Sequence, residues 1–98
     1  MYIRVWEYEV AAAHIDAFLA AYGSEGEWAR LFQRGRGYVG TELYRGTDDQ
    51  SRFVTVDRWT DEHAWSAFLE EAREAYDRLD ERMTHLSAFQ HDLLEGPH

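Results

Sequence analysis

Two stretches decide the fold of this chain: Gly37-Tyr38-Val39-Gly40-Thr41-Glu42-Leu43-Tyr44-Arg45 and Arg52-Phe53-Val54-Thr55-Val56-Asp57-Arg58-Trp59. Both are rich in β-branched and aromatic residues, which favour strands. The polar segment between them, residues 46–51, is short enough to form the loop of a hairpin. We therefore expect two neighbouring antiparallel strands.

The register of this hairpin follows if Arg45 faces Arg52 across the loop. One face of the strand pair then holds aromatic side chains and carboxylates: Tyr38, Gly40, Glu42, Tyr44, Phe53, Thr55, Asp57 and Trp59. The opposite face is aliphatic, with Val39, Thr41, Leu43, Val54 and Val56, and with Arg45, Arg52 and Arg58 at its margins. Neither face is simply polar, so both are expected to be covered.

The flanking segments alternate between strand and helix patterns. Residues 2–10 alternate as a central strand does, and residues 88–94 alternate as a last strand. Apolar residues recur every three or four positions over residues 11–22 and again over residues 60–83, which indicates helices. The order strand, helix, strand, strand, helix, strand predicts an α+β fold of the ferredoxin-like βαββαβ type, in a single domain over residues 1–98.

Local signals predict where the helices begin and end. Gly23 is expected to end the first helix in a left-handed conformation. Ser24 and Glu27 have the spacing of a capping box for a second, short helix. Thr60 is placed to N-cap the long helix, which would continue unbroken to about Met83.

The aliphatic sheet face has no helix to cover it if both helical segments pack on the other side. An isolated monomer seldom exposes such a surface. We expect a homodimer in which two sheets pack face to face through Val39, Leu43, Val54 and Val56.

Composition excludes several classes of function. Ten Arg and no Lys against nineteen acidic residues give a formal net charge of −9, which disfavours binding to nucleic acid or anionic lipid. No cysteine is present, so disulfides, thiolate nucleophiles and cysteine metal sites are excluded. No stretch has the length of a membrane span and the N-terminus has no signal-peptide pattern, so we expect a cytoplasmic protein.

Three segments carry a family resemblance. They are Tyr2-Ile3-Arg4-Val5-Trp6-Glu7-Tyr8, Gly37-Tyr38-Val39-Gly40-Thr41-Glu42-Leu43, and Asp57-Arg58-Trp59-Thr60-Asp61-Glu62. Together they resemble the antibiotic biosynthesis monooxygenase family, and the resemblance spans nearly the whole chain. It implies a dimeric α/β barrel that oxidises a polyphenol, quinol or anthrone-type aromatic molecule with O₂ and without a cofactor.

Such chemistry needs a base, a hydrogen-bond donor and flat apolar walls, because the substrate itself supplies the electrons. Asp57 is the candidate base, with Trp59, Thr55 and His63 as further candidate catalytic residues. The candidate substrate-binding residues are Tyr38, Tyr44, Phe53, Trp65 and Phe68.

Each of these residues also has a structural interpretation. Asp57 can pair with an Arg or cap a backbone amide, Trp59 can be a core aromatic, and His63 can lie on the surface near a helix N-terminus. The aromatic content as a whole, four Trp, six Tyr and five Phe, suits either a ligand site or a small core of large side chains. No metal site is expected.

Two positions depart from the family pattern. Quinone-forming members tend to have Asn four residues before the Trp, where this chain has Thr55, and many members have His ten residues after it, where this chain has Phe68. The loss of both argues against the haem-degrading activity of one branch. The alternative to an oxygenase is therefore a non-catalytic dimeric module that binds a small molecule or has a filled core.

Overall fold

The computed structural model describes residues 1–97, apart from the side chains of Phe89, Leu93 and Pro97. Its strands are β1 Tyr2–Glu9, β2 Tyr38–Arg45, β3 Arg52–Trp59 and β4 Phe89–Pro97. Its helices are η1 Ala12–His14, α1 Ile15–Tyr22, α2 Glu27–Phe32, α3 Glu62–Glu71, α4 Arg73–Met83 and η2 Thr84–Leu86. None of the described helices is long and apolar enough to cross a membrane.

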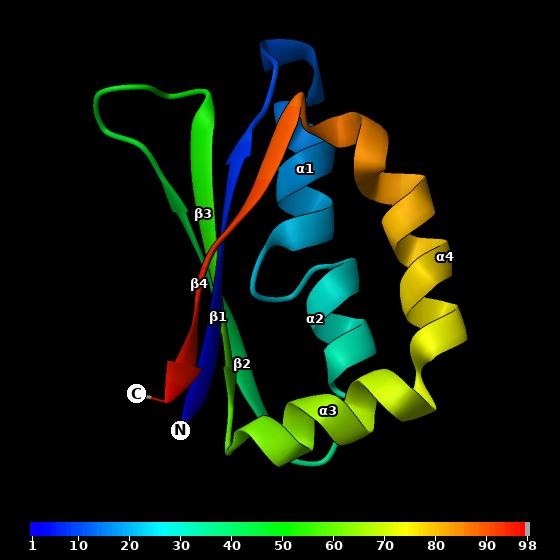
Figure 1. Ribbon diagram of the computed structural model, residues 1–98. Coiled ribbons are helices and arrows are strands. Elements are labelled where there is room, and N and C mark those ends of the chain that lie inside the picture. The colour runs from blue at the N-terminus through cyan, green and yellow to red at the C-terminus, as the bar shows by residue number, and fades with distance from the viewer. Residues whose placement is uncertain (98) are drawn as a thin grey trace.

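The strands form one antiparallel sheet in the order β2-β3-β1-β4. All the α-helices pack on one face of this sheet (Figure 1). This arrangement confirms the α+β ferredoxin-like fold expected from the sequence. Residue-level details of the hairpin and of the helix ends differ from the expectation.

The predicted hairpin register is wrong over most of its length. Tyr38 pairs with Trp59 as expected, but a bulge between Tyr38 and Gly40 shifts the rest, so that Thr41 faces Asp57 and Tyr44 faces Val54. Because side chains alternate across a strand, a shift of one residue exchanges the two faces of β2. Thr41 and Leu43 therefore point toward the helices, and Tyr44 points to the opposite side and is 53% exposed.

The helix boundaries also differ from those that the local sequence signals predict. Gly23 has an extended conformation instead of a left-handed one, and Gly26 occupies the N-cap of α2 with no side-chain cap, so the Ser24–Glu27 capping box is absent. The N-cap of α3 is Asp61, whose carboxylate accepts from the Ala64 backbone N–H at 2.8 Å, and not Thr60.

The long C-terminal helix breaks at Ala72, whose φ and ψ of −107° and 17° are not helical. The break lets α3 run across one end of the sheet while α4 turns to run alongside α1 and α2 (Figure 1). The predicted apolar stripe still packs inward, and its members Trp65, Phe68, Leu79 and Met83 are buried.

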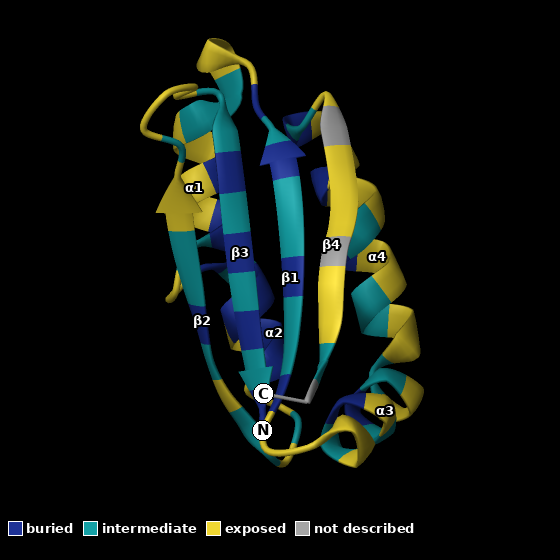
Figure 2. Ribbon diagram, turned by 60° about the vertical axis from the view of Figure 1, so that its left-hand side comes forward, coloured by how far each residue is buried: buried dark blue, intermediate teal, exposed yellow. Residues whose placement is uncertain are grey.

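The core lies between the helices and the inner face of the sheet. Phe18, Phe53 and Trp59 are among its fully buried side chains. On the outer face of the sheet, none of the described helices covers the strands (Figure 2). Here Val5 pairs with Val56, and Leu94 on the neighbouring strand is 50% exposed.

Candidate functional site

A cavity lies between the inner face of the sheet and the helix layer. Its lining comes from every layer of the fold: Trp6, Tyr8, Tyr22, Trp28, Phe32, Thr41, Thr55, Asp57, Trp65, Tyr76, Asp80 and Gln90. It holds about 450 Å³ of atom-free space including its open mouth, but only about 30 Å³ can hold the centre of a water molecule. The cavity is thus a narrow slot, and a ligand of two or more rings requires its walls to separate.

Asp57 is the central polar group of the sheet wall. The residue is only 7% exposed, and its Oδ1 accepts a hydrogen bond from the Thr41 hydroxyl at 2.8 Å. Burial raises the pKa of Asp57 to about 6, and the Thr41 hydrogen bond and the positive charge of Arg4 partly oppose this rise. Asp57 is therefore mainly ionised at neutral pH but close enough to neutrality to accept and return a proton.

A chain of hydroxyl groups surrounds Asp57. Thr41 gives its only proton to Asp57, so the Tyr38 hydroxyl, 2.6 Å from Thr41 Oγ1, must be the donor in that second hydrogen bond. On the neighbouring inward position of β3, the Thr55 hydroxyl lies 3.3 Å from the Tyr8 hydroxyl. The sheet wall thus presents one carboxylate among several hydroxyl groups.

The helix wall has a different character. Trp28 and Tyr76 pack edge to face with ring centroids 5.0 Å apart, and the ring centroids of Tyr22 and Trp28 lie 6.1 Å apart. Burial raises the pKa of both Tyr22 and Tyr76 to about 12, so both phenols are neutral at physiological pH. Asp80 of α4 also lines the cavity here, and its negative charge contributes to both shifts.

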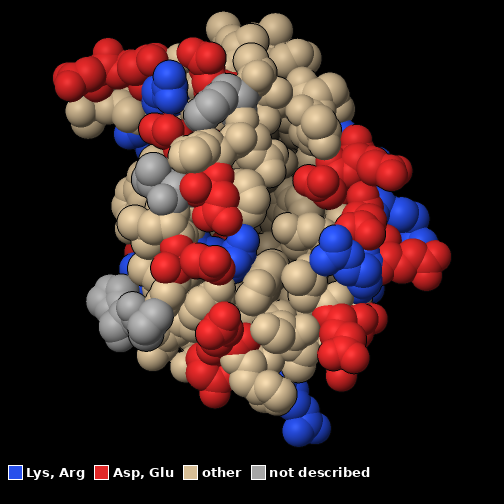
Figure 3. Space-filling model, viewed as in Figure 1, with Lys and Arg blue, Asp and Glu red and all other residues tan. Residues whose placement is uncertain are grey.

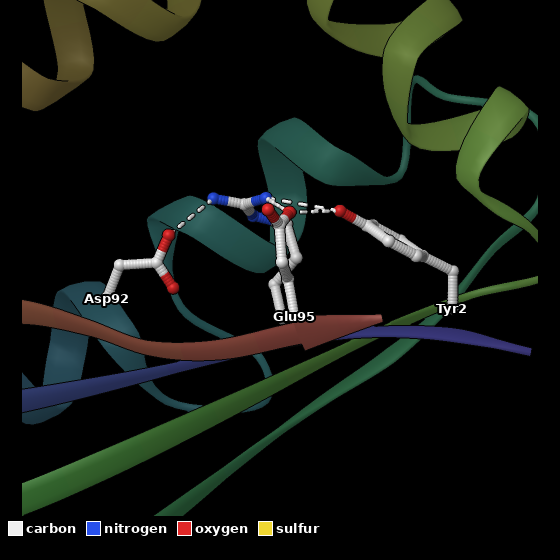
Figure 4. A network of polar contacts seen from close by, with 4 residues as sticks. Tyr2, Asp92 and Glu95 are labelled. Atoms are coloured by element: carbon white, nitrogen blue, oxygen red, sulfur yellow. Dashed lines mark hydrogen bonds and ion pairs between the residues drawn. The ribbon is translucent and has the colours of Figure 1, made fainter. Parts of the chain in front are cut away.

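Arg4 of β1 is the cation whose positive charge lowers the pKa of Asp57. It is the cross-strand neighbour of Asp57, and its guanidinium lies 4.7 Å from the ring centroid of Trp65 and 5.7 Å from that of Trp6. Arg4 is also held from β4, by Glu95 at 2.6 Å and Asp92 at 3.2 Å (Figure 4). The Tyr2 hydroxyl donates to the same Glu95 carboxylate. Arg4 therefore fixes two indoles of the cavity wall.

The structure brings together only some of the residues singled out in the sequence. Asp57, Thr55 and Trp65 line the cavity. Tyr38 contacts it through Thr41. Phe53 and Phe68 are core residues, 1% and 2% exposed, that are not in the lining.

Three other candidates lie elsewhere. Trp59 is fully buried behind the wall, packed on Phe32 and Trp65, and its Nε1 has no hydrogen-bond partner among the described residues. Tyr44 lies on the opposite face of the sheet, because of the register shift. His63 is exposed beside a separate surface groove at the start of α3.

Sequence reasoning missed several lining residues. The predicted hairpin register places Thr41 on the aliphatic face of the strand pair, and only the bulge at Tyr38–Gly40 brings it beside Asp57. Tyr8, Tyr22 and Tyr76 come from three elements far apart in the chain, so no local pattern joins them. Among the described residues, no group of three or more His, Asp or Glu is placed to hold a metal ion.

The family model described as antibiotic biosynthesis monooxygenase matches residues 1–90. The chain belongs to this family. The match includes β1, β2, β3 and all the helices, and thus all the described cavity-lining residues. No protein of curated function matches the chain significantly.

Solved structures share this monooxygenase-family fold at low sequence identity. An alanine variant of SnoaB, a cofactor-independent oxygenase from Streptomyces nogalater, is 24% identical over 97% of this chain and 87% of its own, with a TM-score of 0.71. A second SnoaB structure is 22% identical over 99% and 94% of the two chains, with a TM-score of 0.68. Protein SO0527 from Shewanella oneidensis is 20% identical over 97% and 89%, with a TM-score of 0.67. At these identities the likeness shows the fold alone.

Proposed function

We propose that this member of the family is a cofactor-independent monooxygenase acting on an electron-rich aromatic molecule, of the polyphenol, quinol or anthrone type. The observation that carries the proposal is the buried Asp57 carboxylate, with its raised pKa, in the wall of an aromatic cavity. Membership of the family and the SnoaB-like fold supply the reaction type.

The proposed reaction converts a ring methylene into a ketone. Asp57 takes a proton from the acidic C–H, and the resulting carbanion passes one electron to O₂. The two radicals combine, and the peroxide anion takes the proton back from Asp57. Loss of water from the hydroperoxide then leaves the carbonyl, with one oxygen atom in the product and the other in water. The substrate carbon supplies all four electrons.

The neighbours of Asp57 have supporting roles in this proposal. Thr41 fixes the orientation of the carboxylate through its 2.8 Å hydrogen bond. Thr55 offers a hydroxyl to a substrate oxygen from the adjacent inward position of β3. Trp65 and the other rings provide the flat walls and exclude water, which favours transfer of charge to O₂.

Trp59 and His63 enter the proposal differently. The Trp59 N–H is a donor that gains an acceptor only if the wall of Phe32 and Trp65 opens. Trp59→Phe keeps most of the packing and deletes the donor, so a loss of turnover without a loss of binding assigns that donor a part in the reaction. In the same way, His63 has a part in the reaction only if His63→Gln lowers turnover without lowering binding.

The competing function is a non-catalytic module of the same fold that binds a small molecule or has a filled core. The narrowness of the slot favours the filled core, because only about 30 Å³ is open to the centre of a water molecule. Oxygen uptake with a panel of anthrones and hydroquinones separates the two functions. The oxygenase predicts uptake above the buffer rate that Asp57→Asn abolishes; binding by calorimetry without any uptake favours the module.

We further propose that the protein is a homodimer joined through the outer face of the sheet. Support comes from the aliphatic pair of Val5 and Val56 and from the partly exposed Val54 beside them. In the part of the chain that the structure describes, no helix covers that face (Figure 2). Leu43, named for this interface from the sequence, packs against the core on the inner face instead.

A further inference from the structure

The charged side chains of the described cavity lining are all acidic. Its described lining residues include two carboxylates, Asp57 and Asp80, and no Arg or Lys. Seen from the side of Figure 1, uncharged atoms surround a hollow near the centre of this face and charged side chains lie around it (Figure 3). Burial raises the pKa of Tyr8, Tyr22 and Tyr76 in the lining, so these phenols are neutral and add no charge to the cavity.

Asp80 differs from Glu74 and Asp77 of α4 in its pairing. On the same helix Asp77 pairs with Arg73 at 3.4 Å, and Glu74 pairs with Arg78 at 3.0 Å. Asp80 is partly buried, and no ion pair to it occurs among the described side chains. It lines the helix wall of the cavity together with Tyr22, Trp28 and Tyr76, and its charge raises the pKa of Tyr22 and Tyr76. An unpaired carboxylate beside aromatic rings is the combination that binds organic cations, through charge and through cation–π contacts.

The positive charge of Arg4 does not offset the negative charge of the cavity lining. Its guanidinium lies over the indoles of Trp65 and Trp6 and is paired with Glu95 and Asp92, outside the lining (Figure 4). Two carboxylates of β4 already match its single charge. An anionic ligand would therefore meet Asp57 and Asp80 without a free cation in the described lining to offset them.

We propose that the cavity selects aromatic ligands that carry a protonated amine, with the ammonium group at Asp80 between the rings of Tyr22, Trp28 and Tyr76, and rejects aromatic carboxylates. This inference rests on the cavity of the proposed function and names its ligand class: a hydroxylated aromatic body toward Asp57 with an ammonium group toward α4. The charged group contacts the helix wall and takes no part in the oxidation.

The test measures binding by calorimetry without oxygen, so that its result does not depend on turnover. Three single-ring ligands, chosen to suit the narrow slot, differ in one substituent: 4-(aminomethyl)phenol, 4-(hydroxymethyl)phenol and 4-hydroxybenzoate. The ammonium ligand is expected to bind about tenfold more tightly than the neutral one, and the carboxylate at least about tenfold more weakly. The preference should shrink as salt is added.

Matched variants test whether Asp80 causes the preference for the ammonium ligand. Asp80→Asn should reduce the preference for the ammonium ligand to about twofold or less, whereas Asp77→Asn, which removes the same charge from an exposed position on the same helix, should leave it unchanged. Asp80→Glu keeps the charge and should retain most of the preference. Thermal melts establish that each variant is folded.

Equal affinities for the three ligands, tighter binding of the carboxylate, or an unchanged preference in Asp80→Asn would each overturn the inference. Failure of all three ligands to bind overturns it as well. Selective binding of the ammonium ligand without oxygen uptake by any substrate would instead contradict the oxygenase and leave the charge selection intact.

Discussion

At the scale of single residues, the proposed function depends on how Asp57 is buried. The carboxylate faces Thr41 across the strand pair and has Arg4 as its cross-strand neighbour on β1. A buried acid of this kind costs stability when it is ionised, and the same cost makes it a useful base. Two predictions concern this group.

Asp57 should make folding less stable as the pH rises. Its pKa of about 6 in the folded protein is above the ordinary value of 3.8, so its favourable contribution is complete below about pH 4 and is lost as the pH rises through 6. The full shift corresponds to roughly 3 kcal/mol. Asp57→Asn should therefore be more stable than the wild type at about pH 8, with the difference disappearing near pH 4, as measured by urea unfolding. A constant difference across this range would contradict the burial of a titrating Asp57.

Thr41→Val removes the hydroxyl that links Tyr38 to Asp57. Both partners lose a hydrogen bond, which should lower the free energy of unfolding by about 1–3 kcal/mol. Because that hydrogen bond holds the pKa of Asp57 down, the rise of oxygen uptake with pH should also move to higher pH. Thr41→Ser is the matched control and should restore both properties. A pH profile identical in Thr41→Val and the wild type would remove Thr41 from the site.

At the scale of elements, two irregularities position the cavity. The bulge in β2 turns Thr41 inward, and the break at Ala72 directs α4 so that Tyr76 and Asp80 reach the cavity. The chain enters β2 through Gly37, whose φ of +87° is left-handed and whose carbonyl accepts from the Thr60 backbone N–H at 2.7 Å. This contact joins the two ends of the hairpin at the start of α3.

Gly37→Ala should be strongly destabilising, by about 2 kcal/mol or more. A Cβ there would collide with Thr60 Oγ1 and lie 2.8 Å from Ala64 Cβ, in a backbone conformation that L-residues disfavour. Gly40→Ala is the control on the same strand, because a Cβ at position 40 would have nothing within 4 Å and the φ of Gly40 is not positive. Thermal unfolding of the two variants checks the prediction, and equal losses would contradict it.

At the scale of the whole molecule, the sheet separates two apolar environments. Its inner face contributes to the cavity and core, while over residues 1–97 no helix packs on its outer face (Figures 1 and 2). A second copy packed on the outer face would bury it and would also stiffen the strands that carry Thr55 and Asp57.

Light scattering should report a particle of twice the 11.5 kDa chain mass. Val54→Arg places a charge on the outer face and should yield monomers, whereas Thr47→Arg, which adds the same charge in the exposed loop before β3, should leave the dimer intact. A wild-type monomer at micromolar concentration, or a dimer that persists in Val54→Arg, would contradict the proposed interface.

The sequence by itself determined the alternation of strands and helices, the α+β ferredoxin-like class and the family resemblance, and it named Asp57 as a candidate base. These depend on local periodicity and on short motifs that lie within one segment. Only the tertiary structure decided which face each residue of β2 takes, where the long helix breaks, and that Trp59 lies behind the cavity wall while Tyr8, Tyr22 and Tyr76 form it. A single extra residue in a strand exchanges its two faces, and a cavity forms where distant segments of the chain meet. Neither the faces of β2 nor the lining of the cavity can therefore be predicted from a local sequence pattern.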